Sequence, residues 1–160
     1  STLFPYTTLF RSVKFAGFPV SDIRVIVYDG KSHPVDSKDI AFFTAGRKAV
    51  IEAIRAASPI ILEPIVNIDI DAPETAVGDL SGDLSGKRGQ ITGTQSRSAG
   101  TVSLSGKVPL AELDDYQGRL KSLTGGQGSY SIRFSHYAAV PAATQQQLAA
   151  KHKIVGLDDE

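Results

Sequence analysis

Residues 61–137 switch repeatedly between two hydrophobic periods, and this switching limits the possible folds more than any other feature of the sequence. In ILEPIVNIDIDAP (61–73), Ile and Val alternate with Asn and Asp. In SYSIRFSHY (129–137), Tyr, Ile and Phe alternate with Ser and Arg. Strict alternation is typical of a strand that has one face in water and the other in a core.

Between these two strands the period changes to that of a helix and back. Residues 74–89 and 110–126 place their apolar side chains three and four apart, as on one helical face. Segments 90–97 and 101–110 flank a Ser-Ala-Gly turn at 98–100, which predicts a hairpin. The resulting order is β-α-β-β-α-β, so we expect an α+β, ferredoxin-like domain.

The same periodicity predicts the core of this domain. The residues expected to be buried together are Ile65, Val66, Ile68, Leu80, Leu84, Val102, Leu104, Leu113, Leu120, Ile132 and Phe134.

The N-terminal part predicts a strand, a loop and a helix. DIRVIVYDG (22–30) is rich in β-branched residues and stops at Asp-Gly, which indicates a strand followed by a turn. GKSHPVDS (30–37) is a polar loop, and 38–57 carries apolar residues at helical spacing up to Ser58-Pro59. The apolar stripe of this helix comprises Ile40, Phe43, Val50, Ile51 and Ile54.

Composition excludes several classes of site and partner. The chain has no cysteine, so neither a disulfide nor a thiolate metal site can form. Its formal net charge is zero, so any contact with nucleic acid must be local. No apolar run approaches the ~18 residues that span a bilayer, so we expect no membrane partner.

Two motifs suggest ligands, but their context favours simpler explanations. TGGQGS (124–129) has the glycines of a phosphate loop, yet it closes a helix and opens a strand, which indicates a helix C-cap and turn. GDLSGDLSG repeats an Asp every four residues, whereas a calcium loop needs oxygen ligands at alternate positions. With no P-loop and no G-x-S-x-G motif, we expect no catalytic residue, no metal site and no cofactor in this chain.

Several motifs, in the same order, resemble the C-terminal end of bacterial-type elongation factor G. They are GFPVSDIRVIVYDGKSHPVDSKDIAF, ILEPIVNIDIDAPE, GDLSGDLSGKRGQI, VPLAEL and LKSLTGGQGSYSIRFSHY, and the resemblance runs from about Ala16 to His152. It implies that 13–59 form the distal half of domain IV and that 60–138 form domain V, which is ferredoxin-like. Residues 139–160 would then be a C-terminal helix and a frayed tail.

The resemblance also implies a function. Members of this family are cytoplasmic, monomeric GTPases that drive movement of tRNA and mRNA through the ribosome, and GTP and Mg belong to their G domain. His33 falls where the family carries a histidine at the tip of domain IV, which reaches the decoding region of the small subunit. Gly30, Lys31, Ser32 and Pro34 would shape that loop.

In domain V, which lies near the factor-binding region of the large subunit, Lys87 and Arg88 match basic positions that could contact rRNA. The family often carries an arginine-rich run where this chain has Gly86-Lys87. This departure leaves the role of the pair open.

Residues 1–12, STLFPYTTLFRS, read codon for codon like a translated sequencing adapter, and no targeting motif fits them. We therefore expect a partial sequence, without the G domain, in which 1–12 have no evolved function. Two alternatives stay open. The parent protein could be an elongation-factor-G-like paralogue with weak translocation activity. The chain could also be a stand-alone ferredoxin-like ligand-sensing module, which would need a ligand pocket and a dimer edge within 61–137.

Overall fold

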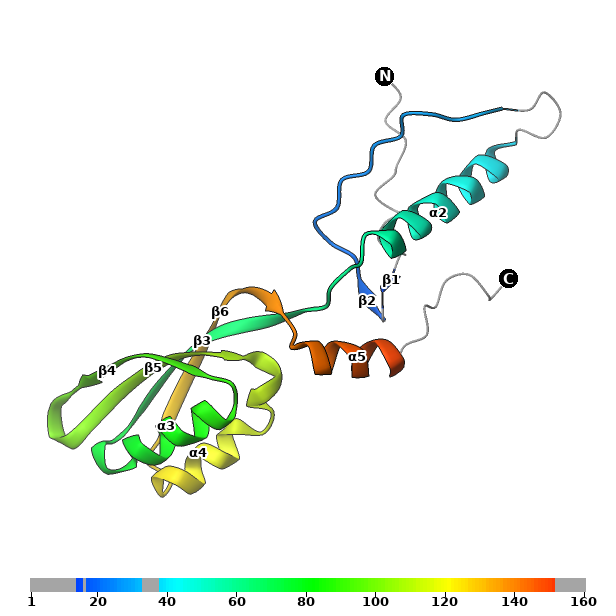
Figure 1. The fold of residues 1–160 in the computed structure, drawn as a ribbon. Coiled ribbons are helices and arrows are strands. Elements are labelled where there is room, and N and C mark those ends of the chain that lie inside the picture. Colours follow the sequence, from blue (N-terminus) through cyan, green and yellow to red (C-terminus); the bar gives the residue numbers. More distant parts are fainter. Residues whose placement is uncertain (1–13, 16, 33–37, 152–160) are drawn as a thin grey trace. The chain divides into compact units, whose positions relative to one another are not determined.

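The structure is a computed structural model, and it describes residues 14–15, 17–32 and 38–151 (Figure 1). The chain divides into two compact units. The sheet unit comprises residues 62–139, all of which are described, and the helical unit comprises 1–61 together with 140–160.

The sheet unit has the predicted order of strands and helices. Its strands and α-helices are β3 (Leu62–Pro73), α3 (Val77–Gly86), β4 (Gln90–Ser96), β5 (Thr101–Pro109), α4 (Tyr116–Thr124) and β6 (Ser129–Ala139). Short 3-10 turns stand at η1 (Glu74–Ala76), η2 (Ser98–Gly100) and η3 (Leu110–Leu113). The four strands form an antiparallel sheet in the order β4-β5-β3-β6, which confirms the α+β, ferredoxin-like fold.

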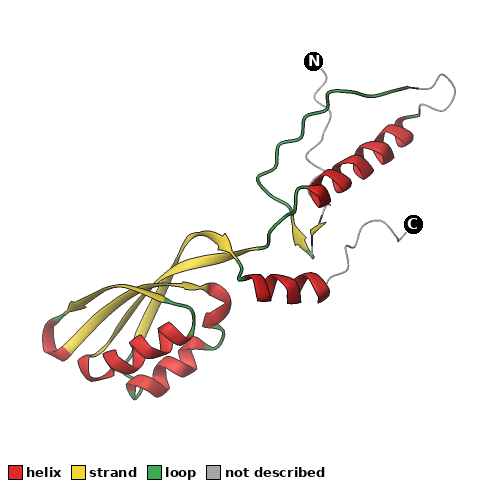
Figure 2. Cartoon of the chain, in the orientation of Figure 1, coloured by secondary structure: helices red, strands yellow, loops and turns green. Residues whose placement is uncertain are grey.

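One face of the sheet is covered by α3 and α4 and holds the core (Figure 2). In the central strand β3, Val66, Ile68 and Ile70 are buried, whereas the intervening Asn and Asp residues lie on the opposite, open face. The leucine stripes of both helices meet these side chains. The buried cluster consists of Val66, Ile68, Ile70, Ala72, Ala76, Leu80, Leu84, Leu104, Val108, Leu113, Tyr116 and Leu120.

The predicted core is wrong at two positions on β6. Ile132 and Phe134 pair with Ile68 and Val66 and so share the helix-covered face, yet they are 42% and 60% exposed. Because β6 lies at the edge of the sheet, the core covers only part of this strand: Tyr130 packs against the core, whereas Ile132 and Phe134 are outside the buried cluster. Ile65, also expected in the core, is only half-buried, at the rung where a β-bulge shifts the register of β3 and β6.

The glycines of TGGQGS form the C-terminal turn of α4, as predicted. Gly125 caps the helix in the left-handed conformation, and the N–H of Gly126 donates to the carbonyl oxygen of Lys121. Gly128 leaves room for Thr124, because a Cβ at Gly128 would lie 2.8 Å from the Thr124 hydroxyl oxygen.

The helical unit contains β1 (Lys14–Phe15), β2 (Phe18–Pro19), α2 (Asp39–Ala56) and α5 (Ala142–Lys151). β1 and β2 form a short antiparallel pair, and α2 confirms the predicted helix. The strand predicted over 22–30 is wrong: this segment joins no sheet among the described residues. A strand needs a neighbour for its backbone N–H and C=O groups, and none of the described residues supplies one.

The apolar stripe of α2 is covered only toward its C-terminal half. Ile51 is buried, and Val50 and Ile54 are half-buried. Ile40 and Phe43, nearer the start of the helix, are 68% and 50% exposed. The predicted helix face therefore exists but is only partly packed in the described part of the chain.

Candidate functional site

The predicted tip loop is described only in its first part. Gly30, Lys31 and Ser32 are exposed, and the N–H of Gly30 donates to Oδ1 of Asp29 over 2.8 Å. This bond is local, and the turn predicted at Asp29-Gly30 does not form: the described residues 23–32 contain no turn. His33 and Pro34 lie outside the described residues, so the role of the loop stays a prediction.

The second predicted site, Lys87-Arg88, lies at the end of α3. The N–H of Gly89 donates to the carbonyl oxygen of Leu84 over 2.7 Å, and the N–H of Arg88 donates to Ser85 over 3.2 Å. These two bonds form a Schellman motif, in which Arg88 takes the left-handed position that glycine usually occupies. The next residue, Gly89, has to be glycine, because a Cβ at this position would lie 2.7 Å from the Leu84 carbonyl oxygen.

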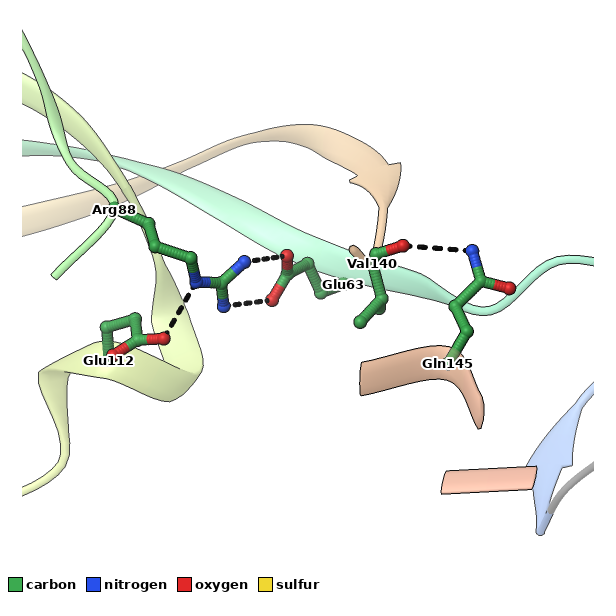
Figure 3. Close-up of polar contacts among 5 residues, drawn as sticks. All are labelled: Glu63, Arg88, Glu112, Val140 and Gln145. Atoms are coloured by element: carbon green, nitrogen blue, oxygen red, sulfur yellow. Dashed lines mark hydrogen bonds and ion pairs between the residues drawn. The ribbon is translucent and has the colours of Figure 1, made fainter. Parts of the chain in front are cut away.

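The left-handed backbone directs the Arg88 side chain toward two carboxylates (Figure 3). Its two terminal nitrogens donate to both oxygens of Glu63 over 2.7 and 2.9 Å, and Nε donates to Glu112 over 2.8 Å. These bonds, led by those to Glu63, raise the pKa of Arg88 above its ordinary value. The bidentate geometry joins the end of α3 to the start of β3 and to η3.

Lys87 is also held inside the sheet unit. Its Nζ donates to the carbonyl oxygen of Glu112 over 3.1 Å and lies 5.9 Å from the centre of the Tyr116 ring. The resemblance matches Lys87 and Arg88 to basic positions that could contact rRNA, and in the structure both cations have partners within the protein. Contact with rRNA therefore stays a prediction, and it would require these groups to exchange or share their partners.

Glu63 and Glu112 are the residues that sequence reasoning missed. They lie 25 and 24 positions from Arg88, and neither belongs to a motif with Arg88. A carboxylate beside Pro64 at the start of a strand gave no local signal. Pairing at this separation follows from the fold and cannot be derived from spacing.

The open face of the sheet carries a smaller charged cluster. The Ser105 hydroxyl donates to Oδ1 of Asp69 over 2.6 Å, and Arg133 donates to Oδ2 over 3.0 Å. The hydrogen bond from Ser105, assisted by Arg133, lowers the pKa of Asp69 below its ordinary value. Next to this cluster, Nε of Arg97 lies 3.5 Å from Oδ1 of Asp71, which makes an exposed ion pair.

Among the described residues, no group of three or more His, Asp or Glu side chains is arranged to bind a metal ion. The described helices likewise include none that is both long and apolar enough to cross a membrane.

Comparison with known families accounts for both units. A model described as "Elongation factor G, domain IV" matches residues 12–58, and a model described as "Elongation factor G C-terminus" matches residues 60–148. The second match alone covers more than half of the chain. The chain belongs to the elongation factor G family. The resemblance stated from the motifs is confirmed.

Relatives in this family include elongation factor G from Aquifex pyrophilus, which is 46% identical over 141 residues, 88% of this chain. An elongation factor G-like protein from Thermotoga maritima is 40% identical over 138 residues, 86% of this chain. The chain spans only about a fifth of the length of these relatives, 19% and 20%.

A crystal structure of a protein from Thermus thermophilus matches with a TM-score of 0.76 and 36% identity, over 93% of this chain and 24% of that one.

Proposed function

We propose that this chain is the part of a translation elongation factor that contacts the ribosome during GTP-dependent movement of tRNA and mRNA. The observation that carries the proposal is the match of 12–58 to domain IV of elongation factor G, together with 60–148 matching its C-terminus. In this proposal the loop around Gly30, Lys31 and Ser32 leads to His33 at the decoding region. Its described part is exposed and has no contact that would hide it.

GTP hydrolysis is assigned to the remainder of the full-length protein. This chain has no G-x-x-x-x-G-K-[ST] sequence to cradle phosphates, and its described residues form no cluster suited to Mg²⁺. Its proposed contribution is therefore mechanical: it carries the tip loop and the sheet unit. GTP and Mg²⁺ act elsewhere in the full-length protein, and the purified chain should bind neither.

The proposal is tested in the full-length protein by comparing two histidine substitutions. His33→Ala should slow translocation while leaving ribosome-stimulated GTP hydrolysis nearly unchanged, because the tip acts on the tRNA–mRNA duplex. The matched control is His136→Ala on β6, an exposed histidine whose Nδ1 lies 2.9 Å from the Ser135 hydroxyl. That control should leave both rates unchanged, and equal translocation rates for all three proteins would contradict the role of His33.

A second function, that of a paralogue with weak translocation activity, is favoured by one comparison. The Thermotoga maritima relative is described as elongation factor G-like. Reconstituted translation separates the two: the paralogue would hydrolyse GTP on ribosomes but would move tRNA and mRNA poorly even before any substitution.

A further inference from the structure

The two chain segments that connect the units run side by side at Ile61 and Val140. The last paired rung of β3 and β6 joins Leu62 and Ala139. One residue further, the N–H of Val140 donates to the carbonyl oxygen of Ile61 over 3.0 Å. In an antiparallel ladder such a pair exchanges two hydrogen bonds, so the Ile61 N–H should donate to the Val140 oxygen in return.

The structure replaces that second bond by a side chain. The Ile61 N–H donates instead to Oε1 of Gln145 over 3.4 Å. Nε2 of Gln145 donates to the Val140 oxygen over 2.9 Å, and Figure 3 shows this second bond. The carboxamide has one acceptor and one donor side, like a peptide group. It therefore occupies the position of the missing rung and leaves neither backbone group without a partner.

The same contact fixes α5. Gln145 lies in the first turn of α5, where its own N–H donates to the carbonyl oxygen of Pro141 over 2.9 Å. One helical turn later, Leu148 packs against Ile61 and Val140, which are both 5% exposed. The polar and the apolar contact lie on the same face of the helix, at positions three apart.

We propose that Gln145 is a positioning residue. Its carboxamide ends the β3–β6 ladder and, through its hydrogen bonds to the backbone of Ile61 and Val140, holds α5 against these two residues. We call these two hydrogen bonds the Gln145 contact. The match to the elongation factor G C-terminus extends past β6 and stops at Leu148, the last residue of this contact. The Gln145 contact therefore lies within the matched part of the chain and not in the tail beyond it.

The sequence around Gln145 supplies matched controls, because it reads Gln145-Gln146-Gln147. Gln146 and Gln147 are exposed, whereas Gln145 is half-buried. Gln145→Ala in the full chain should speed hydrogen exchange of the α5 amides about tenfold, because two hydrogen bonds of the docked state are lost. Gln146→Ala and Gln147→Ala should change exchange less than about twofold, since they have equal helix propensity and no contact with the connection.

A charged variant distinguishes the effect of the Gln145 contact from an effect on the intrinsic stability of the helix. Gln145→Glu keeps an acceptor for the Ile61 N–H, but an ionised carboxylate cannot donate to the Val140 oxygen. Protection of α5 should therefore be lost at about pH 7 and should return near pH 4, where the protonated acid can donate. Gln146→Glu and Gln147→Glu have the same net charge and should show no such return.

Two results would overturn the inference. One is an equal effect of alanine at 145, 146 and 147 on the exchange of α5. The other is a Gln145→Glu variant whose α5 amides are as protected at neutral pH as those of the parent chain, or whose lost protection does not return in acid.

Discussion

At the scale of single residues, Tyr116 combines complete burial with a polar atom that has no partner. Its side chain is 1% exposed and its ring meets Tyr130 edge to face, with centroids 5.2 Å apart. Its hydroxyl, and Oδ2 of the neighbouring Asp83, have no hydrogen bond within the described residues. Burial, assisted by the Asp83 charge, raises the pKa of Tyr116 from 10.0 to about 12.

Tyr116→Phe should therefore leave the stability at neutral pH unchanged or raise it by up to about 1 kcal/mol, because a buried hydroxyl without a partner is removed. The difference should grow in alkali. The folded-state pKa is above the ordinary value, so the protonated tyrosine stabilises the fold below pH 10.0 and this contribution is lost as the pH rises toward about 12. The free energy of unfolding of the parent chain should fall by roughly 2–3 kcal/mol between pH 10.0 and about 12, and that of the Phe variant should not show this fall.

Urea unfolding from neutral pH to about pH 12 measures both effects. Tyr137→Phe is the control, since that side chain is 63% exposed and should show neither. Destabilisation by Tyr116→Phe of more than about 1 kcal/mol at neutral pH would mean that the hydroxyl has a partner.

At the scale of elements, the sheet shows that position in the sheet decides burial more than residue type does. Ile68 on β3 and Ile132 on β6 are chemically identical and directly opposite each other in the register. Ile68 is 0% exposed because β3 has a strand on each side and helices above it. Ile132 is 42% exposed because β6 has a strand on one side only.

The two isoleucines therefore predict opposite results for the same substitution. Ile68→Ala should lower the free energy of unfolding by about 2–5 kcal/mol, because it leaves a cavity under both helices. Ile132→Ala should cost less than about 1 kcal/mol, because solvent already reaches that side chain. Circular dichroism during urea unfolding gives both values, and equal costs would contradict the edge position of Ile132.

This pair also shows which parts of the fold the sequence can predict. Leu80, Leu84 and Leu120 were assigned to the core correctly, because helical spacing fixes which side chains share a face. The alternation in β6 assigned Ile132 to the correct face but could not tell that β6 is an edge strand, since strand order depends on contacts distant in sequence. The same limit applied to the sites: the pairing of Arg88 with Glu63, 25 positions away, follows from tertiary packing, which no motif encodes.

At the scale of the whole chain, the two units differ in how completely their secondary structure is packed. The sheet unit pairs all four strands and buries a continuous core beneath two helices. In the described part of the helical unit, residues 22–30 have no strand neighbour, and α2 has Ile51 as its only buried side chain. The local composition of both parts favours strands and helices, so propensity does not explain the difference.

Packing should instead set the rate at which amides exchange with solvent, because exchange follows the free energy of local opening. Amides of β3, β5 and α3 should exchange slowest, since exposing them requires opening of the core. Residues 22–30 should exchange fastest, because their N–H groups are not bonded to a neighbouring strand. α2 should be intermediate, because packing of the apolar face supplies most of a helix's stability and this face is only partly packed. Hydrogen–deuterium exchange with mass spectrometry on the full chain resolves these segments. Protection of 22–30 as strong as that of β3 would contradict the prediction, because those amides would then have backbone partners that the described residues do not supply.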